Sequence, residues 1–286
     1  MTQVNALTVD VEDYFQVNAF APYISRESWD SFPLRVDTNT RRILDLFDEH
    51  GVKATFFVLG WVAKRLPQLA REIQQRGHEI ACHGYHHELI YKIGPDRFRE
   101  DIRAAKQLLE EQTGSRISGY RAPSYSITRQ SLWALRILVE EGFSYDSSIF
   151  PVHHDTYGIP GAERFPHTLQ TEAGSLREFP LTTMPLRCGR WEAHLPIAGG
   201  GYLRLLPVAL IRKGMAAINA KEKQPVVLYF HPWEIDPDQP RIKAGMKSTF
   251  RHYANLGRTE RKLKYLLSHL GFSTMANALG VVRGSS

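Results

Sequence analysis

The segment that decides the fold is His78-Glu79-Ile80-Ala81-Cys82-His83, which runs directly into Gly84-Tyr85-His86-His87. Its first half is a short apolar run of the kind that forms a buried β-strand. Its second half places two imidazoles four positions apart, a spacing that lets both side chains reach one metal ion. We therefore expect a buried strand that delivers a candidate metal site at its carboxyl end.

Outward from this segment, short apolar runs alternate with longer stretches of helical periodicity. Glycines at 51, 77 and 142 each follow an expected helix and precede an expected strand, where a left-handed helix C-cap belongs. Repeated strand–helix–strand units with short links imply parallel strands, and about seven such units favour a closed or nearly closed barrel over an open sheet. We expect strands at 5–10, 53–59, 78–83, 117–121, 144–147, 175–181 and 225–231, and helices at 38–50, 62–76, 95–113, 128–141, 203–220 and 248–270.

The chain shows no internal repeat and no low-complexity linker, which favours a single domain over residues 1–286. Residues 150–203 break the alternation and are rich in Pro, Gly and His, so we expect a long irregular excursion over one end of the barrel. Residues 232–286 form a C-terminal extension that begins with another irregular stretch, 232–250.

Composition narrows the class of protein. The 286 residues are 43% hydrophobic, as expected for a globular core, and no run of eighteen apolar residues could span a membrane. The net charge of +6 is compatible with an anionic substrate such as a diphosphate-linked sugar, but such an excess is more often an ordinary solvated surface. No basic block with interleaved aromatics indicates nucleic-acid binding.

Two features bear on the compartment. The first residues already resemble a core strand rather than a signal peptide, so we expect a cytoplasmic protein, with membrane association left open. The two cysteines, Cys82 and Cys188, do not form a disulfide framework.

The strand ends carry the chemistry. Asp10, His83, Arg121, Asp146 and His231 each stand at the carboxyl end of an expected strand. In a barrel of parallel strands these ends converge on one face, where the loops build the active site. Residues more than two hundred positions apart are therefore expected to meet in one pocket.

A metal site needs a third ligand besides His83 and His87. Two histidines and one carboxylate form a common catalytic set, with one position open for water. On an extended strand Asp10 and Glu12 point to the same side, so one could bind the metal while the other takes a proton. Which of the two carboxylates is the ligand stays open at this point.

Three further residues complete the expected chemistry. Arg121 beside Asp10 would keep that carboxylate ionised and oriented. His231 ends an apolar run, where a histidine can protonate a leaving group. Asp146 is a candidate to orient and tune His231.

These residues belong to motifs that resemble the polysaccharide deacetylases, the NodB-homology group of carbohydrate esterases. The motifs occur in the order of that family and cover residues 8–231. Some pieces, among them Gly199-Gly-Gly-Tyr and His231-Pro-Trp-Glu, are similar to the branch associated with bacterial exopolysaccharide loci. The matching pieces are Thr8-Val9-Asp10, His83-Gly-Tyr-His-His87, Arg121-Ala-Pro-Ser-Tyr125, Tyr145-Asp146-Ser-Ser148 and Leu228-Tyr-Phe-His231.

The resemblance implies an α/β fold, a distorted (β/α)7 barrel related to the TIM barrel, and metal-dependent removal of acetyl groups from an N-acetylated glycan. It assigns Asp10 as base, Arg121 as the residue that positions it and His231 as general acid. His83 and His87 are implied metal ligands. The implied cofactor is a divalent cation, Zn²⁺ first, with Co²⁺, Ni²⁺ or Fe²⁺ as alternatives. The implied partner is the N-acetylated glycan, free or linked to a diphosphate lipid, and the oligomeric state stays open.

The chain departs from the family pattern in three places. The usual Asp-Asp-Gly opening is here Asp10-Val11-Glu12-Asp13, which leaves the third metal ligand open. With Asp10 as the base, the alternation of side chains along a strand favours Glu12 as this ligand, and Asp13 remains an alternative. Ser124 is inserted before Tyr125, so either backbone N–H could stabilise the oxyanion. The residue that holds the acid histidine in the family has no clear equivalent in this sequence, and we predict that Asp146 takes this role beside His231.

Two other functions are kept as alternatives. A metal-independent cyclic-amide hydrolase could use the same barrel, although His83 and His87 argue against it. A non-catalytic glycan-binding relative would be expected to lack the base or the acid, whereas Asp10 and His231 are both present.

Overall fold

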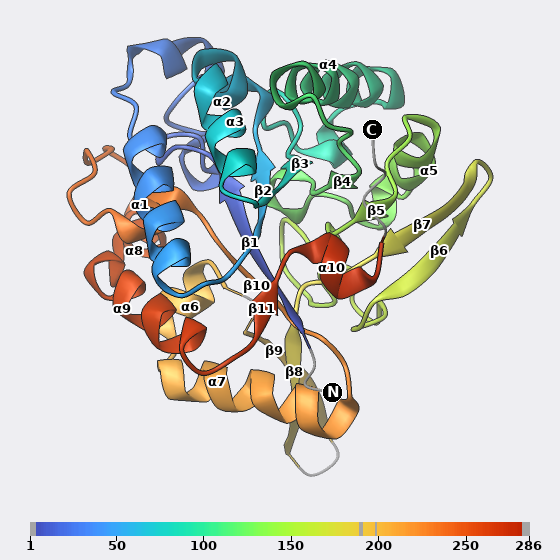
Figure 1. Cartoon of the computed structure of the whole chain (residues 1–286), viewed down its shortest axis with the longest axis vertical. Coiled ribbons are helices and arrows are strands. Elements are labelled where there is room, and N and C mark those ends of the chain that lie inside the picture. Colours follow the sequence, from blue (N-terminus) through green and yellow to red (C-terminus); the bar gives the residue numbers. More distant parts are fainter. Residues whose placement is uncertain (1–3, 189–190, 198, 282–286) are drawn as a thin grey trace.

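The computed structural model describes residues 4–188, 191–197 and 199–281. Helices surround a strongly curved sheet (Figure 1). The helices are α1 (Val36–Glu49), α2 (Gly60–Arg65), α3 (Pro67–Gln75), α4 (Pro95–Thr113), α5 (Trp133–Glu140), α6 (Gly201–Leu205), α7 (Val208–Ala217), α8 (Met246–Tyr253), α9 (Leu256–Leu267) and α10 (Met275–Leu279). The strands are β1 (Asn5–Val11), β2 (Thr55–Val58), β3 (Glu79–Cys82), β4 (Gly119–Tyr120), β5 (Tyr145–Asp146), β6 (His167–Thr171), β7 (Gly174–Glu178), β8 (Thr183–Cys188), β9 (Trp191–Pro196), β10 (Val227–Phe230) and β11 (Phe272–Ser273).

The sheet confirms the expected parallel topology. Its order is β10-β1-β2-β3-β4-β5-β7-β6, and every neighbouring pair from β10 to β7 is parallel. β6 is antiparallel to β7. β11 lies off this path and pairs in parallel with the first residues of β1. β1 is buried along its whole length, as a central strand covered on both faces should be.

A side chain closes the gap between the two ends of this path. The hydroxyl of Thr182, just after β7, accepts from the backbone N–H of Val227 in β10 (2.7 Å) and donates to its carbonyl (3.1 Å). Between β7 and β10 the ring is therefore joined by this threonine and, further along β10, by the isolated parallel bridge between Gly199 and Tyr229.

A helix covers one end of the barrel, and the other end stays open. At the amino end of the strands, the buried Glu79 carboxylate accepts from Tyr145 Oη (3.0 Å) and from the backbone N–H of Ala276 in α10 (3.1 Å). Met275 N–H donates to Thr55 Oγ1 (2.7 Å) in the same place. α10 thus covers the amino end (Figure 1, red), and the carboxyl end is left for the functional site.

Three expected helices are each two helices in the structure. The stretch 62–76 divides at Leu66, because Pro67 disfavours helical geometry in the residue before it. The stretch 203–220 divides at Pro207. The stretch 248–270 divides near Asn255, whose φ of 60° ends the ladder of hydrogen bonds.

The excursion over 150–203 is more regular than expected. It contains the hairpins β6–β7 and β8–β9, and β7 extends the main sheet. Strands from both halves of the chain therefore build one sheet, while the count of one domain stays a prediction. Within the described ranges, no helix combines the length and apolar character that crossing a membrane requires.

Candidate metal centre and catalytic site

Glu12, His83 and His87 gather at the carboxyl end of β1 and β3. One ligand atom from each lies within 4.8 Å of the other two, and all three side chains are buried. His87 Nε2 is 2.6 Å from Glu12 Oε2, yet that oxygen accepts no hydrogen bond from the described residues. A buried carboxylate oxygen without a hydrogen bond is costly, and a cation held between these atoms would satisfy it. Two imidazoles and a carboxylate thus fit a divalent metal.

The loop after β3 is shaped to present the two histidines. The Asp101 carboxylate in α4 accepts from the backbone N–H groups of Tyr85 (2.7 Å) and His86 (3.0 Å). Gly84 has φ of 73°, and a Cβ there would lie 2.8 Å from Asp101 Oδ2, so the turn requires glycine. His83 Nδ1 lies 2.8 Å from the Arg121 carbonyl, which leaves Nε2 for a metal.

Asp13 does not take part in this group. Its carboxylate accepts from the backbone N–H groups of Tyr14 (2.9 Å), Arg35 (2.8 Å) and Val36 (3.0 Å), at the start of α1. Burial raises the pKa of Asp13 to about 6 against the lowering effect of these hydrogen bonds. The alternative that made Asp13 a metal ligand does not fit the structure, because the chain turns after β1 and directs this side chain to α1.

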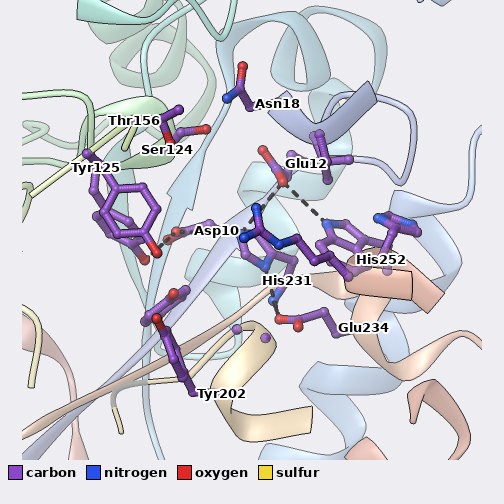
Figure 2. A pocket seen from close by; sticks show the side chains of 18 of the residues that line it. Asp10, Glu12, Asn18, Ser124, Tyr125, Thr156, Tyr202, His231, Glu234 and His252 are labelled. Carbon is purple, nitrogen blue, oxygen red and sulfur yellow. Dashed lines mark hydrogen bonds and ion pairs between the residues drawn. The ribbon is translucent and has the colours of Figure 1, made fainter. Parts of the chain in front are cut away.

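Asp10 lies beside the triad and is held by Arg121, as expected. Arg121 Nη1 donates to Asp10 Oδ1 (2.6 Å) and to Thr8 Oγ1 (2.8 Å), and the guanidinium is fully buried. Arg121 also donates to the carbonyl and hydroxyl of Ser147 (3.2 and 3.1 Å). Tyr125 Oη donates to Asp10 Oδ2 (3.4 Å), so both carboxylate oxygens are oriented (Figure 2).

His231 approaches the same group from β10. Its Nε2 lies 3.6 Å from Glu12 Oε1 and 3.9 Å from Asp10 Oδ2. Its Nδ1 lies 3.0 Å from Glu234 Oε2, and Arg204 Nε donates to the other oxygen of Glu234 (2.6 Å; Figure 2 shows the contact between His231 and Glu234). Burial alone would lower the pKa of His231, but Glu12 and Glu234 raise it to about 9.

The carboxylate that holds His231 is therefore Glu234, and the nomination of Asp146 was wrong. Asp146 accepts from the Ser148 hydroxyl (2.5 Å) and backbone N–H (3.3 Å). Ser148 Oγ in turn accepts from Ala122 N–H (2.8 Å), so Asp146 supports the strand end that carries Arg121. Burial raises the pKa of Asp146 to about 6 and that of neighbouring Glu178 well above its ordinary value.

Glu234 was missed although its signal was present in the sequence. It follows His231 by three residues, and Pro232 begins a 3-10 turn over Pro232–Ile235. Such a turn places residues i and i+3 on one side, which brings the carboxylate back to the imidazole and to the His231 backbone N–H (3.0 Å).

These side chains open into a cavity of about 570 Å³. Figure 2 shows Tyr125, Thr156 and Tyr202 on one side of it and Glu12, His231 and His252 on the other. The wall at Tyr202 depends on the glycines before it: Gly199 has φ of 144°, and a Cβ there would lie 1.6 Å from the Tyr229 carbonyl oxygen. Only glycine allows this segment to approach β10 so closely.

Comparisons with known proteins agree with this arrangement. The polysaccharide deacetylase family model matches residues 28–139, and a domain of unknown function (DUF3473) matches residues 147–280. The peptidoglycan-N-acetylglucosamine deacetylase of Bacillus cereus is 35% identical over 96 residues, which are 33% of this chain and 35% of that protein. The match therefore spans only about a third of the length of this curated relative.

Among solved structures, a putative polysaccharide deacetylase from Mycobacterium smegmatis has a TM-score of 0.62 at 25% identity, over 99% of this chain and 90% of that one. The Puue allantoinase has a TM-score of 0.63 at 17% identity, over 97% and 89% of the two chains, which shows a shared fold. The family model, the buried triad and this fold therefore agree: the chain is similar to polysaccharide deacetylases over residues 28–139 and to a domain of unknown function over residues 147–280.

Proposed function

We propose that this protein hydrolyses the N-acetyl amide of a glycan, releasing acetate and a free amino sugar. The observation that carries the proposal is that a candidate base, Asp10, and a candidate acid, His231, both lie beside the Glu12/His83/His87 triad. Asp10 is held by a buried arginine, and His231 is held by a buried glutamate. Amide hydrolysis requires a base and an acid close to one metal site, and here a cationic side chain holds the base while an anionic one holds the acid.

Glu12, His83 and His87 would hold the cation, and we propose that this cation is zinc. When bound, a divalent cation lowers the pKa of water and polarises an amide carbonyl. Asp10 accepts the proton of the attacking water, and the hydrogen bond from Arg121 orients its carboxylate. The hydroxyl oxygen forms the new bond to the carbonyl carbon.

The remaining steps use the backbone of Ser124 and the side chain of His231. Tyr125 N–H already donates to the Ala122 carbonyl (3.0 Å), so we assign oxyanion stabilisation to the Ser124 N–H. His231 Nε2 donates its proton to the amine as the carbon–nitrogen bond breaks. Glu234 keeps the proton on Nδ1, so that Nε2 is the donor in the imidazolium.

The direct test is acetate release from N-acetylated oligosaccharides, with metal content measured on the same sample. We expect activity to be lost with a chelator and restored by zinc or cobalt. His83→Ala should lose the metal, whereas Asp10→Asn should keep it and lose turnover. A metal-free His83→Ala protein with full activity would refute the proposal.

The two alternative functions make different predictions for the same sample. A cyclic-amide hydrolase that needs no metal would act after chelation, and elemental analysis of the purified protein separates it from the proposal. A glycan-binding protein without turnover would bind the oligosaccharides and release no acetate. The oriented pair of Asp10 and His231 favours turnover.

A further inference from the structure

The cavity has a basic wall that the proposed chemistry does not use. Lys247 and Arg251 on α8 both line it, together with the triad residues and His231. Positions four residues apart stand on the same face of a helix, so both cations are presented to the cavity together. Both side chains are largely exposed, and each therefore has room to meet a ligand.

Among the described residues, neither Lys247 nor Arg251 forms an ion pair with a carboxylate. Their charges reach His154, which lines the same cavity: burial first, and then the charges of Arg251 and Lys247, lower the pKa of this histidine. Asp155 opposes this effect and lines the same space. The positive potential on this side of the cavity is thus only partly balanced.

The wall is held in place from inside the protein. The buried Arg204 guanidinium donates to the carbonyls of Arg251 (2.7 Å), His252 (2.8 Å) and Ala254 (3.0 Å) at the end of α8. The same guanidinium donates to Glu234, which holds His231. One buried side chain therefore contacts both the helix that carries the two cations and the carboxylate that holds the proposed acid.

The basic wall also has its own origin in the sequence. α8 lies within residues 147–280, the stretch matched by the domain of unknown function, and outside the stretch matched by the deacetylase model. Any ligand contact made by α8 is thus a feature of residues 147–280 and not of the stretch that matches the deacetylase model.

We propose that Lys247 and Arg251 form a subsite for an anionic group of the glycan, a carboxylate or a phosphate, carried near the N-acetyl group that the metal site receives. This inference rests on the proposed deacetylation, and it specifies its substrate class as an acidic glycan. Carboxylates and phosphates are the ligands that paired Lys and Arg side chains bind through charge-assisted hydrogen bonds. A uronic acid would supply the first and a sugar phosphate the second.

A different ligand for α8 would be an anionic lipid surface, because Met246 and Phe250 on the same helix are 91% and 64% exposed. The observations favour the glycan: the two cations line the cavity that contains Asp10 and His231, whereas Met246 and Phe250 do not. The experiment therefore includes vesicles as a separate arm.

Binding can be measured without turnover on the zinc-loaded Asp10→Asn protein by calorimetry. Three oligosaccharides of equal length serve as probes: a neutral N-acetylated one, one with a uronic acid, and one with a terminal phosphate. We expect one acidic probe to bind roughly tenfold more tightly than the neutral one, because two partly exposed charge pairs contribute a few-fold each. The stronger acidic probe identifies the group, and its advantage should fall as salt is added.

The decisive variant is Lys247→Gln combined with Arg251→Gln, which should bring the acidic-to-neutral affinity ratio close to one. Lys243→Gln is the matched control, because Lys243 is exposed near α8 but does not line the cavity, and the ratio should persist. Equal affinity of the parent protein for all three probes would overturn the inference, as would a ratio that survives the double substitution. Loss of binding to phosphatidylglycerol vesicles with the ratio intact would overturn it in favour of the lipid surface.

The outcome is separable from that of the proposed function. Acetate release by the unmodified protein from the neutral probe tests deacetylation alone. The affinity ratio on the Asp10→Asn protein tests the anionic subsite alone.

Discussion

Replacing Glu234 by Gln tests the proposed acid most directly, because it removes a charge and keeps the shape of the side chain. In the parent protein Glu234 Oε2 lies 3.0 Å from His231 Nδ1, and the carboxylates of Glu12 and Glu234 raise the pKa of His231 to about 9. A cation bound to Glu12 offsets the charge of that carboxylate, so Glu234 then provides most of the remaining effect. An adjacent opposite charge shifts a pKa by about 1–3 units, so the variant histidine should titrate at least about one unit lower.

The sign follows from the role of His231 as a proton donor. Activity requires the protonated imidazole, so it declines as pH rises through the pKa of His231. In Glu234→Gln this alkaline decline should begin about one unit or more closer to neutrality. If the pKa falls from about 9 by about one to three units, the protonated fraction at pH 8, and kcat with it, should fall about 2- to 100-fold. Metal content should not change, because Glu234 does not belong to the triad.

The same substitution also leaves the buried Arg204 without its carboxylate. Breaking a buried ion pair costs about 3–5 kcal/mol, and the lower end applies because Arg204 keeps three carbonyl partners. Denaturant unfolding measures this loss, and activity is then assayed well below the unfolding transition. Arg204→Lys is the control, since it disturbs the same region while leaving the Glu234 carboxylate beside His231.

The assay is the pH profile of kcat from acetate release between pH 6 and 10. If the folded, metal-loaded Glu234→Gln protein kept both the parent rate at pH 8 and the parent alkaline limb, the assignment of His231 as an acid held by Glu234 would be refuted.

Other substitutions test separate parts of the structure. Asp10→Asn should retain the metal and lower kcat by about 10²–10⁴, the range of a general base, and unchanged turnover would remove Asp10 from the mechanism. His83→Ala should abolish metal binding in elemental analysis, and full metal occupancy would show that the triad is misassigned. Glu178 is buried beside Asp146 with its pKa raised well above the usual value, so the parent protein should lose stability as pH rises above the ordinary glutamate pKa, by up to about 1.4 kcal/mol per unit for one proton. Glu178→Gln should flatten this decline in denaturant titrations at pH 5 and 8, and parallel declines in the two proteins would contradict the raised pKa of Glu178. Gly199→Ala places a methyl group 1.6 Å from the Tyr229 oxygen and should destabilise the fold by more than about 2 kcal/mol, so an unchanged midpoint would contradict the close approach.

Much of the site could be predicted because it lies at strand ends. Strand parity and parallel topology were sufficient to bring Asp10, Glu12, His83 and His87 to one place, and the structure has all four there. The contact of Arg121 with Asp10 followed from the same reasoning. Glu234 escaped prediction because a 3-10 turn after β10 set its direction, and neither strand nor helix periodicity describes such a turn.

The boundaries of helices were less predictable for a related reason. Helical periodicity continues across Pro67, Pro207 and Asn255, so the pattern of apolar residues alone joined segments that the backbone separates. Within residues 150–203 the strand expected at 175–181 is β7, but its partner β6 and the hairpin β8–β9 were missed, because short partly exposed strands have little apolar alternation.

By itself the sequence determined which groups are available and at which strand ends they stand, since these depend on local periodicity and on the two-residue repeat of a strand. Only the tertiary structure decided which carboxylate each group meets. Asp13 accepts hydrogen bonds at α1, Asp146 supports the strand of Arg121, and Glu234 holds His231. Such choices depend on loop directions and on long-range contacts such as Arg204 with α8, and these arise from packing of the whole chain rather than from any local pattern.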